Sequence, residues 1–512
     1  MRAESASASS TAHRAVTAGG LRAAASGGRA GALSGCLPEV RWAVIFDGVA
    51  AILAYVLVLI LRSEAGQARF LGRFAFAVDW TMLILLGVLF VTLNLFGLYE
   101  REVFVSRRVH LWALLKAIIW ALLVTVAIVY LGGLHVAFGS RFVVVGTFVV
   151  FFALVLGLRI VGISSIVAAR LMDRPAPTLV VGDPRRTENL QARLIDLKGF
   201  TDLSVLPLKG GDRALVERLS AALDQAGVAG AAGATRFAHV FIDAASMAPK
   251  TALDLAARAR SAGADVYVVS DLLRSLSCRS LLSDLFQAPV VRLRGGEEGR
   301  LRRVAQRALD IVGAVVALVL LAPLMAAIAL AVKLTSPGPV LFAQERIGRH
   351  GRPFTFYKFR SMVADSTAEP HREFVHEFIN GKGGLRQTFA VGDDAPYKLA
   401  DDPRVTRVGR FLRKYSLDEL PQFWNVLVGD MSLVGPRPAL PYEVDEYRDW
   451  HRRRLALLPG VSGLWQIDGR SRVSFDEMVF QDVMYGYARS VLVDVMICLR
   501  TLPAALMGRG AK

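Results

Sequence analysis

The sequence predicts a multi-domain membrane protein. We expect a four-helix transmembrane unit, a Rossmann-like α/β domain, a re-entrant membrane helix and a mixed α/β, helix-rich C-terminal domain. Hydrophobic residues make up 54% of the 512 residues, which excludes an ordinary soluble protein. Apolar runs long enough to cross a bilayer occur in the first third of the chain and again at 311–332. Strands alternate with helices between them, which favours a parallel sheet.

The expected boundaries follow the changes in composition. They are 1–38 for a disordered basic tail, 39–170 for four transmembrane helices, 171–297 for the α/β domain, 298–335 for a linker and the re-entrant helix, and 336–512 for the last domain. The tail lacks the apolar core of a secretory signal. Three scattered cysteines indicate neither a disulfide framework nor a thiolate metal site.

Four apolar stretches of membrane-spanning length lie near 42–61, 77–98, 109–133 and 142–166. Ten flanking arginines fall on one side of this unit and four on the other, so both ends of the unit are expected in the cytoplasm. The net charge of +17 fits this bias and an affinity for anionic membrane lipids. The positive charge could instead serve to bind phosphate-rich substrates. Nucleic-acid binding is disfavoured because no recognised nucleic-acid-binding module is visible.

The α/β domain is expected to hold strands at 177–183, 238–245 and 264–270, with helices at 187–197 and 251–263. Its first turn reads GDPRRT and lacks the glycines of a dinucleotide site. We therefore favour a structural or regulatory role over nucleotide binding. The Arg-rich stretch 290–303 is expected to be a linker.

The stretch YSLDELPQFWNVLVGD (415–430) carries adjacent carboxylates at Asp418 and Glu419. Ser416 and Glu419 match a capping box, but Pro421 would then disrupt the helix, so we place the N-cap at Asp418 or later. An Asp at a helix start stays ionised near a natural phosphate position. An ordinary N-cap remains the alternative. Adjacent side chains on a helix diverge by about 100°, so the two carboxylates would divide two roles.

Cations follow in several patterns. The strand-like FTFYKFRSM (354–362) places Lys358 and Arg360 on one face. A helical stripe of Arg404, Arg407, Arg410 and Arg413 is mostly expected to face solvent or lipid headgroups. Prolines on both sides of Arg437 present its planar donor fork to a phosphate or carboxylate, unless the turn is only structural.

Two further patterns are weaker. The glycine-punctuated stretch 459–472 offers Gln466 and Arg470 as substrate contacts. His371 and His376 lack zinc-helix spacing and are expected at the surface. Acidic ligands beside phosphate-binding cations favour Mg²⁺ over zinc.

Five motifs together closely resemble the bacterial polyprenyl-phosphate hexose-1-phosphate transferases of the monotopic phosphoglycosyl transferase superfamily. They cover nearly all of 304–500 and read RALDIVGA…APLM, SPGPVLFAQERIG, FYKFRSM, DPRVTRVGRFLRKYSLDELPQFWNVLVGDMSLVGPRP and PGVSGLWQIDGRS. The preceding helices and α/β domain resemble the long subfamily that initiates exopolysaccharide, O-antigen or capsule repeat units. The insertion at 363–397 has no assigned role.

The resemblance implies transfer of hexose-1-phosphate from UDP-hexose, with glucose or galactose as the sugar, to undecaprenyl phosphate, with Mg²⁺. Asp418 would attack the β-phosphate and carry the phosphosugar, and Glu419 would help hold the metal. Arg437 would contact the nucleotide or its phosphates. Lys358 and Arg413 match basic positions near the substrate phosphates, and Arg307 and Asp310 match the mouth of the membrane segment.

A cytoplasmic UDP-sugar donor also bears on the segment around Pro323. A fifth crossing would place Asp418 outside, whereas a break at Pro323 lets the segment enter one leaflet and return. The catalytic domain is therefore expected on the cytoplasmic face of the bacterial inner membrane. A homodimer is left open, and the alternatives for the whole chain are a processive polysaccharide synthase and a non-enzymatic membrane scaffold.

Overall fold

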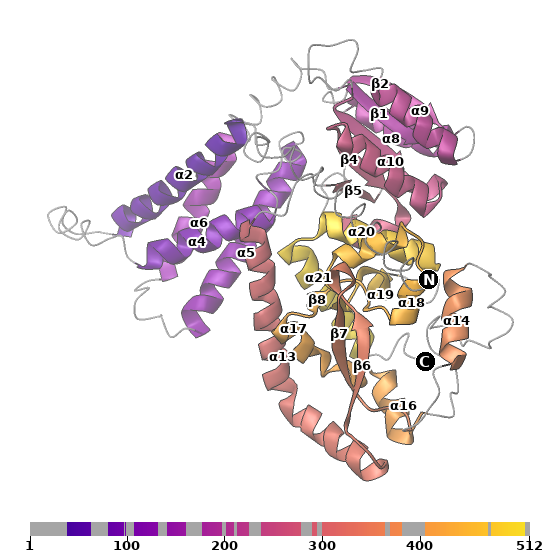
Figure 1. The fold of residues 1–512 in the computed structure, drawn as a ribbon. Coiled ribbons are helices and arrows are strands. Elements are labelled where there is room, and N and C mark those ends of the chain that lie inside the picture. The colour runs from indigo at the N-terminus through magenta and orange to yellow at the C-terminus, as the bar shows by residue number, and fades with distance from the viewer. Residues whose placement is uncertain are drawn as a thin grey trace, which may run out of the picture. The chain divides into compact units, whose positions relative to one another are not determined.

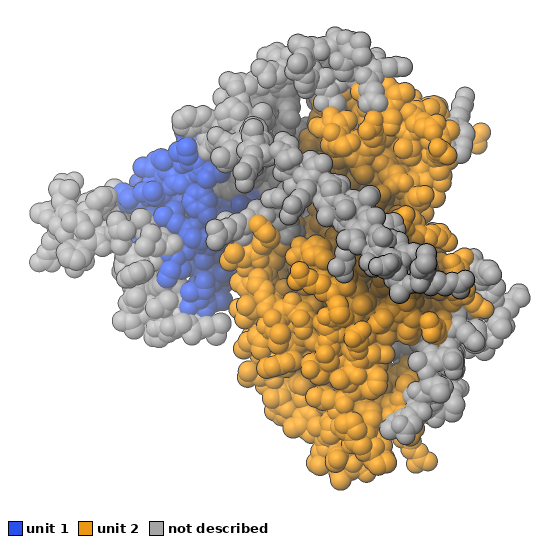
Figure 2. Space-filling view, in the orientation of Figure 1, with its two compact units in different colours: residues 1–174 blue, residues 175–512 orange. Residues whose placement is uncertain are grey.

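The computed structural model divides into two compact units, residues 1–174 and 175–512 (Figure 2). The structure describes residues 38–62, 80–96, 98, 107–131, 141–159, 177–196, 201–208, 212–224, 237–277, 289–293, 300–363, 369–380, 405–468 and 473–506. The predicted tail at 1–38 therefore lies almost wholly outside the described residues.

The described part of the first unit contains four apolar helices at the predicted positions: α2 (Pro38–Arg62), α4 (Trp80–Leu95), α5 (Arg107–Leu131) and α6 (Arg141–Leu156). Small and apolar side chains such as Ala54, Leu114 and Phe151 form their common core. Their outer faces are also apolar, because Trp112 and Val149 are 60% and 62% exposed. Helices that are apolar on both faces suit a lipid environment.

An ion pair is buried in this unit. Arg159 donates from Nε to Asp47 Oδ1 (3.0 Å) and from Nη2 to Asp47 Oδ2, and Nη1 donates to the Leu98 carbonyl (2.8 Å). The two side chains are 0% and 1% exposed. Each of the three guanidinium nitrogens of Arg159 has an oxygen partner, so the pair ties the chain just after α6 to α2 and to the chain after α4.

The second unit begins with a five-stranded sheet of order β2-β1-β3-β4-β5 (Figure 1). The strands are β1 (Pro177–Gly182), β2 (Thr201–Pro207), β3 (His239–Asp243), β4 (Asp265–Val269) and β5 (Val290–Leu293), with helices α8 (Pro184–Asp196), α9 (Asp212–Asp224) and α10 (Pro249–Ser261). Strands β1 to β4 are parallel, as predicted. The stretch 290–293, expected to be linker, instead pairs antiparallel with β4.

Helix α13 (Arg300–Thr335) runs for 36 residues with Pro323 inside it. The expected break is a bend rather than an interruption: the helix stays continuous and changes direction near its middle (Figure 1). Within the described residues, two helical segments are long and apolar enough to cross a membrane, His110–Ile128 and Arg302–Thr335. Only 11% of the apolar window of the latter is buried, so it is no ordinary core helix.

The remaining chain folds against α13. An antiparallel hairpin of β6 (Leu341–Ile347) and β7 (Pro353–Phe359) is followed by α14 (Glu369–Ile379), α16 (Arg407–Lys414), η7 (Leu417–Glu419) and α17 (Gln422–Val428). Strands β8 (Ser432–Val434) and β9 (Gly460–Ser462) pair in parallel. Between them in the sequence lie α18 (Pro441–Asp445) and η8 (His451–Ala456). The chain ends with α19 (Leu464–Asp468), α20 (Phe475–Ala488) and α21 (Val491–Leu506).

Helix α20 joins the α/β domain to the C-terminal domain that begins with α13. It contacts β5, α10 and η5 (Asp271–Leu273) of the former and η8 and α19 of the latter. Every residue from Met478 to Tyr485 is buried. A helix buried on all sides belongs inside a core, and one hydrophobic cluster indeed runs through both domains.

Candidate active site

The acidic dyad lies in the short turn η7, immediately before α17. Asp418 is 7% exposed and Glu419 is half-buried. The N-cap was predicted at Asp418 or later, and it lies at Pro421, which occupies the N-cap position of α17, so Asp418 itself is not the cap. Ser416 precedes η7. Ser416 makes no capping bond within the described structure, so the rejection of the capping box is confirmed. Its left-handed φ of 55° is uncommon for serine and turns the chain sharply into the dyad.

Two residues of α13 hold the chain that follows the dyad, Arg307 at the end of α17 and Asp310 at β8. Arg307 donates to the carbonyls of Val426 (2.7 Å) and Leu427 (2.8 Å), which α17 leaves without helical partners. Asp310 accepts from Ser432 Oγ and Leu433 N, both at 2.9 Å. The predicted mouth of the membrane segment therefore fixes the helix that follows the dyad.

Helix α16 supplies Arg413 in its last turn. Its N-cap Thr406 accepts from Gly409 N (2.9 Å). A Cβ on Gly409 would lie 2.0 Å from the Ser361 carbonyl, so only glycine lets α16 approach the chain after β7 so closely. Arg407 and Arg410 are exposed, as expected for most of the stripe, and Arg404 lies outside the described residues.

Lys358 on β7 meets the dyad. Burial, together with the charges of Arg346 and Arg413, lowers its pKa to about 8, while the charges of Asp418 and Glu419 act in the opposite direction. These four side chains are therefore its electrostatic neighbours. Its Nζ also lies 5.0 Å from the centre of the Phe342 ring. The structure thus assembles carboxylates and cations that the sequence separates by up to 73 positions.

Arg346 is a site residue that the sequence analysis missed. It is buried, and burial together with Arg437 lowers its pKa to about 10, while Glu443 and Glu419 raise it. Its Nη1 donates to the Pro438 carbonyl (3.0 Å). A signal was available, since Arg346 lies in the motif SPGPVLFAQERIG, on which the family resemblance partly rests.

The Arg437 turn is rigid, as predicted. Gly460 N donates to the Pro436 carbonyl (2.8 Å), and Arg346 holds the Pro438 carbonyl. A Cβ on Gly435 would lie 2.3 Å from the Leu458 carbonyl, so the turn packs directly on backbone. Arg437 therefore enters the site with little conformational entropy left to lose.

Three other residues, Arg360, Gln466 and Arg470, were also predicted to contact the substrate. Arg360 does not share the site with Lys358: it donates to the Pro337 and Ser336 carbonyls (2.9 and 2.7 Å) and stabilises the turn after α13. β7 ends at Phe359, so the strand alternation no longer applies at Arg360. Gln466 lies on α19. Arg470 lies outside the described residues.

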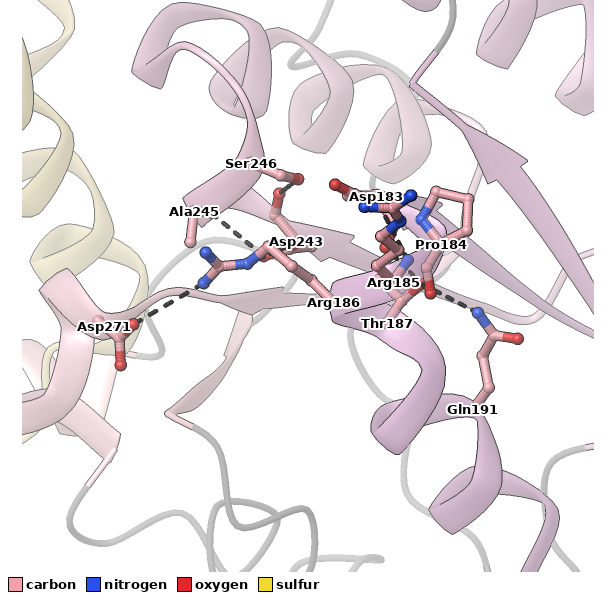
Figure 3. Close-up of polar contacts among 10 residues, drawn as sticks. All are labelled: Asp183, Pro184, Arg185, Arg186, Thr187, Gln191, Asp243, Ala245, Ser246 and Asp271. Atoms are coloured by element: carbon pink, nitrogen blue, oxygen red, sulfur yellow. Dashed lines mark hydrogen bonds and ion pairs between the residues drawn. The ribbon is translucent and has the colours of Figure 1, made fainter.

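A second candidate lies in the α/β domain, where the strand order reverses between β1 and β3 (Figure 3). Arg186 reaches Asp243 (3.6 Å) and Asp271 (3.9 Å). The first amides of α8 are already used, because Arg185 N donates to Asp183 Oδ1 and Thr187 N to the Asp183 carbonyl. The occupied amides of α8 support the structural interpretation of GDPRRT.

Comparison with known proteins identifies the fold around the dyad. A family model described as bacterial sugar transferase matches residues 301–508, from α13 to the end of α21. The exopolysaccharide production protein ExoY of Rhizobium meliloti (strain 1021) is 39% identical over 218 residues, which are 42% of this chain and 92% of that protein. The chain belongs to the bacterial sugar transferase family.

Longer relatives of this sugar transferase match over a smaller share of their length. The undecaprenyl-phosphate galactose phosphotransferase of Salmonella typhimurium (strain LT2) is 40% identical over 223 residues, 43% of this chain and 44% of that protein. The UDP-glucose:undecaprenyl-phosphate glucose-1-phosphate transferase of Escherichia coli (strain K12) is 36% identical over 254 residues, 48% of this chain and 50% of that protein. The matched region thus spans half or less of these two relatives.

Proposed function

We propose that this sugar transferase moves hexose-1-phosphate from UDP-hexose to undecaprenyl phosphate, giving undecaprenyl-diphosphate-hexose and UMP. The observation that carries the proposal is the buried Asp418 beside Lys358, Arg346 and Arg413 in the family-matched domain. The relatives' names, which include both galactose and glucose transferases, support the substrate class. The product would start an exopolysaccharide, O-antigen or capsule repeat unit.

In the first half-reaction a carboxylate oxygen of Asp418 attacks the β-phosphorus of UDP-hexose. The bond from that phosphorus to the bridging oxygen breaks, and UMP leaves with the electron pair. In the second half-reaction a phosphate oxygen of undecaprenyl phosphate attacks the same phosphorus and releases Asp418. Carboxylates attack phosphate anions poorly, so Lys358, Arg346 and Arg437 must neutralise the charge that both steps concentrate.

The dyad also fits a divalent cation. Among the described residues no group of three or more acidic, His or Cys side chains could hold a metal by itself. Mg²⁺ commonly uses one or two carboxylates together with substrate phosphates, so Glu419, with the donor diphosphate, suits it. The ion would supply further charge neutralisation at the diphosphate.

We also propose a membrane arrangement. The four helices of the first unit cross the bilayer, and α13 enters the cytoplasmic leaflet, bends at Pro323 and returns. The exposed apolar side chains of α13, such as Leu320 (72%) and Leu334 (76%), support burial in lipid. Single cysteines placed before 300 and after 336 should react with a membrane-impermeant reagent from the same side. Reaction from opposite sides would contradict the re-entrant arrangement.

The function is tested with the full chain, UDP-hexose and undecaprenyl phosphate. Wild type should form a lipid-linked monosaccharide and UMP, whereas a processive synthase would form polymer and a scaffold nothing. Asp418→Asn should lower UMP release by about a thousandfold or more because the amide is not nucleophilic. Asp445→Asn, at an exposed position on α18, is the matched control. UMP release at the wild-type rate from Asp418→Asn would refute the nucleophile.

A further inference from the structure

The turn that carries Arg437 begins at the end of β8, and Val434 is the last residue of that strand. The Val434 carbonyl lies 3.2 Å from the hydroxyl oxygen of Tyr485 on α20, and the same hydroxyl lies 2.6 Å from Asp494 Oδ1 on α21. The side chains of Tyr485 and Asp494 are both buried. A tyrosine hydroxyl has one proton to donate, so it cannot donate to both oxygens at once.

A proton on Asp494 resolves this conflict. An ionised carboxylate only accepts hydrogen bonds, so it would take the Tyr485 proton and leave the Val434 carbonyl without this donor. A protonated Asp494 instead donates to the Tyr485 oxygen, and Tyr485 donates to the Val434 carbonyl. Only the second arrangement makes both contacts hydrogen bonds, and 2.6 Å is an ordinary length for an O–H donor and an oxygen acceptor.

The charges around Asp494 also favour the neutral acid. Arg489 Nε lies 3.5 Å from Asp494 Oδ2, and Arg489 Nη2 donates to Ser432 Oγ (2.9 Å), which donates to Asp310 Oδ1 (2.9 Å). Two buried carboxylates thus engage one guanidinium, Asp494 directly and Asp310 through Ser432. A buried charge without a full partner is costly. Burial, together with the charge of Asp310, accordingly raises the pKa of Asp494 to about 6, against the opposing effect of Arg489.

Two further titratable groups face Asp494, and both stay neutral. Burial raises the pKa of the Cys498 thiol, on the same helix, to about 12, and it raises the pKa of the Tyr485 hydroxyl well above its usual value. The hydroxyl therefore keeps its proton throughout the neutral range. Ionisation of Asp494 only changes where that proton points.

The Tyr485 contact bears on the site through a short stretch of chain. Only Gly435 and Pro436 separate Val434 from Arg437. The ring of Pro436 fixes its φ, and the turn packs directly on backbone at Gly435. A turn with so little freedom cannot absorb a shift of the Val434 carbonyl, so the shift displaces Arg437.

We propose that Tyr485 and Asp494 are positioning residues for the donor site: neutral Asp494 donates to Tyr485, which holds the Val434 carbonyl and with it the Arg437 turn. The inference rests on the proposed function, because the donor phosphates are what Arg437 would contact. Ionisation of Asp494 turns the Tyr485 proton away from Val434 and loosens the turn. The value of kcat/KM for UDP-hexose is therefore higher when Asp494 is neutral.

Asp494→Asn separates this arrangement from an ordinary ion pair. The amide nitrogen donates to Tyr485 at every pH, while the amide oxygen faces Arg489. The kcat/KM of the variant should equal that of wild type at about pH 5 and exceed it by about tenfold at about pH 7.5, where wild type loses one buried hydrogen bond. An ionised Asp494 paired with Arg489 predicts the reverse, because removing one partner of a buried ion pair is destabilising at both pH values. A kcat/KM below that of wild type at both pH values would overturn the proposal.

Tyr485→Phe keeps the ring and removes the hydroxyl. Its kcat/KM should lie about tenfold below that of wild type at about pH 5 and approach the wild-type value at about pH 7.5, where the bond to Val434 is already lost. The matched control is Tyr487→Phe on the same helix, which should behave as wild type at both pH values. Equal ratios to wild type at the two pH values in Tyr485→Phe would contradict the role of Asp494.

Two measurements on the full chain need no turnover. Peptides covering 432–440 should exchange hydrogen faster in Tyr485→Phe than in Tyr487→Phe at about pH 5. The infrared difference between wild type and Asp494→Asn at that pH should contain the band of a protonated carboxyl group. Equal exchange in the two tyrosine variants, or a missing carboxyl band, overturns the proposal. If wild type forms no lipid-linked product, the proposed function fails, while these two measurements still decide the positioning of the turn.

Discussion

Arg307→Met should loosen the helix that follows the dyad. Arg307 makes two charge-assisted bonds to the last carbonyls of α17, at 2.7 and 2.8 Å, and Val426 is fully buried. Each such bond contributes about 1.5–3 kcal/mol, and the cation also favours the negative helix end by about 0.3–1 kcal/mol. Since methionine packs in part of the same space, we expect a net loss of about 3 kcal/mol, which is roughly a 150-fold increase in local opening.

Hydrogen exchange followed by mass spectrometry measures this opening directly. Peptides covering 422–430 should lose protection from hydrogen exchange in Arg307→Met. The value of kcat/KM should also fall, because α17 no longer supports the turn that carries the dyad. Arg303→Met, an exposed arginine one turn earlier on α13, is the control. Equal protection of 422–430 in the two variants would refute the claim that Arg307 anchors α17.

Three further outcomes are expected. Because the folded pKa of Lys358 is lowered to about 8, kcat/KM should fall above pH 8 as its proton is lost, and Lys358→Arg should move that fall beyond pH 10. Arg159→Met should lower stability by about 3–5 kcal/mol in thermal unfolding by leaving Asp47 charged and buried, and Asp47→Leu in the same chain should restore much of it. Gly435→Ala should lower kcat/KM at least about tenfold with unchanged circular dichroism, because its Cβ would clash with the Leu458 carbonyl.

The sequence predicted the parts of the fold with strong periodicity. The apolar helices, the parallel strands β1, β3 and β4 and the dyad before a helix all carry local signals that tertiary packing reinforces. Strand β5 was missed because Val290–Leu293 has only four residues, one of them Arg292. Its pairing with β4 depends on a neighbour that local sequence does not reveal.

The site was predicted less completely for a related reason. Sequence indicates where cations occur, but not which of them the backbone turns toward the dyad. Arg360 follows Lys358 by two positions yet leaves the strand, and its guanidinium is used by the Ser336 and Pro337 carbonyls. Arg346 reaches the site because β6 pairs with β7 in one register, a non-local fact.

The complete burial of Met478–Tyr485 has a thermodynamic consequence. Since α20 contributes to the hydrophobic core of both the sheet domain and the catalytic domain, neither core is complete without the other domain. The two domains should therefore unfold in one cooperative transition. A chain cut to 298–512 would expose the side of α20 that now contacts β5 and α10, and should aggregate unless that surface is made polar. Any event that stabilises the sheet would then raise the stability of the dyad's domain by mass action, without any contact to the dyad itself.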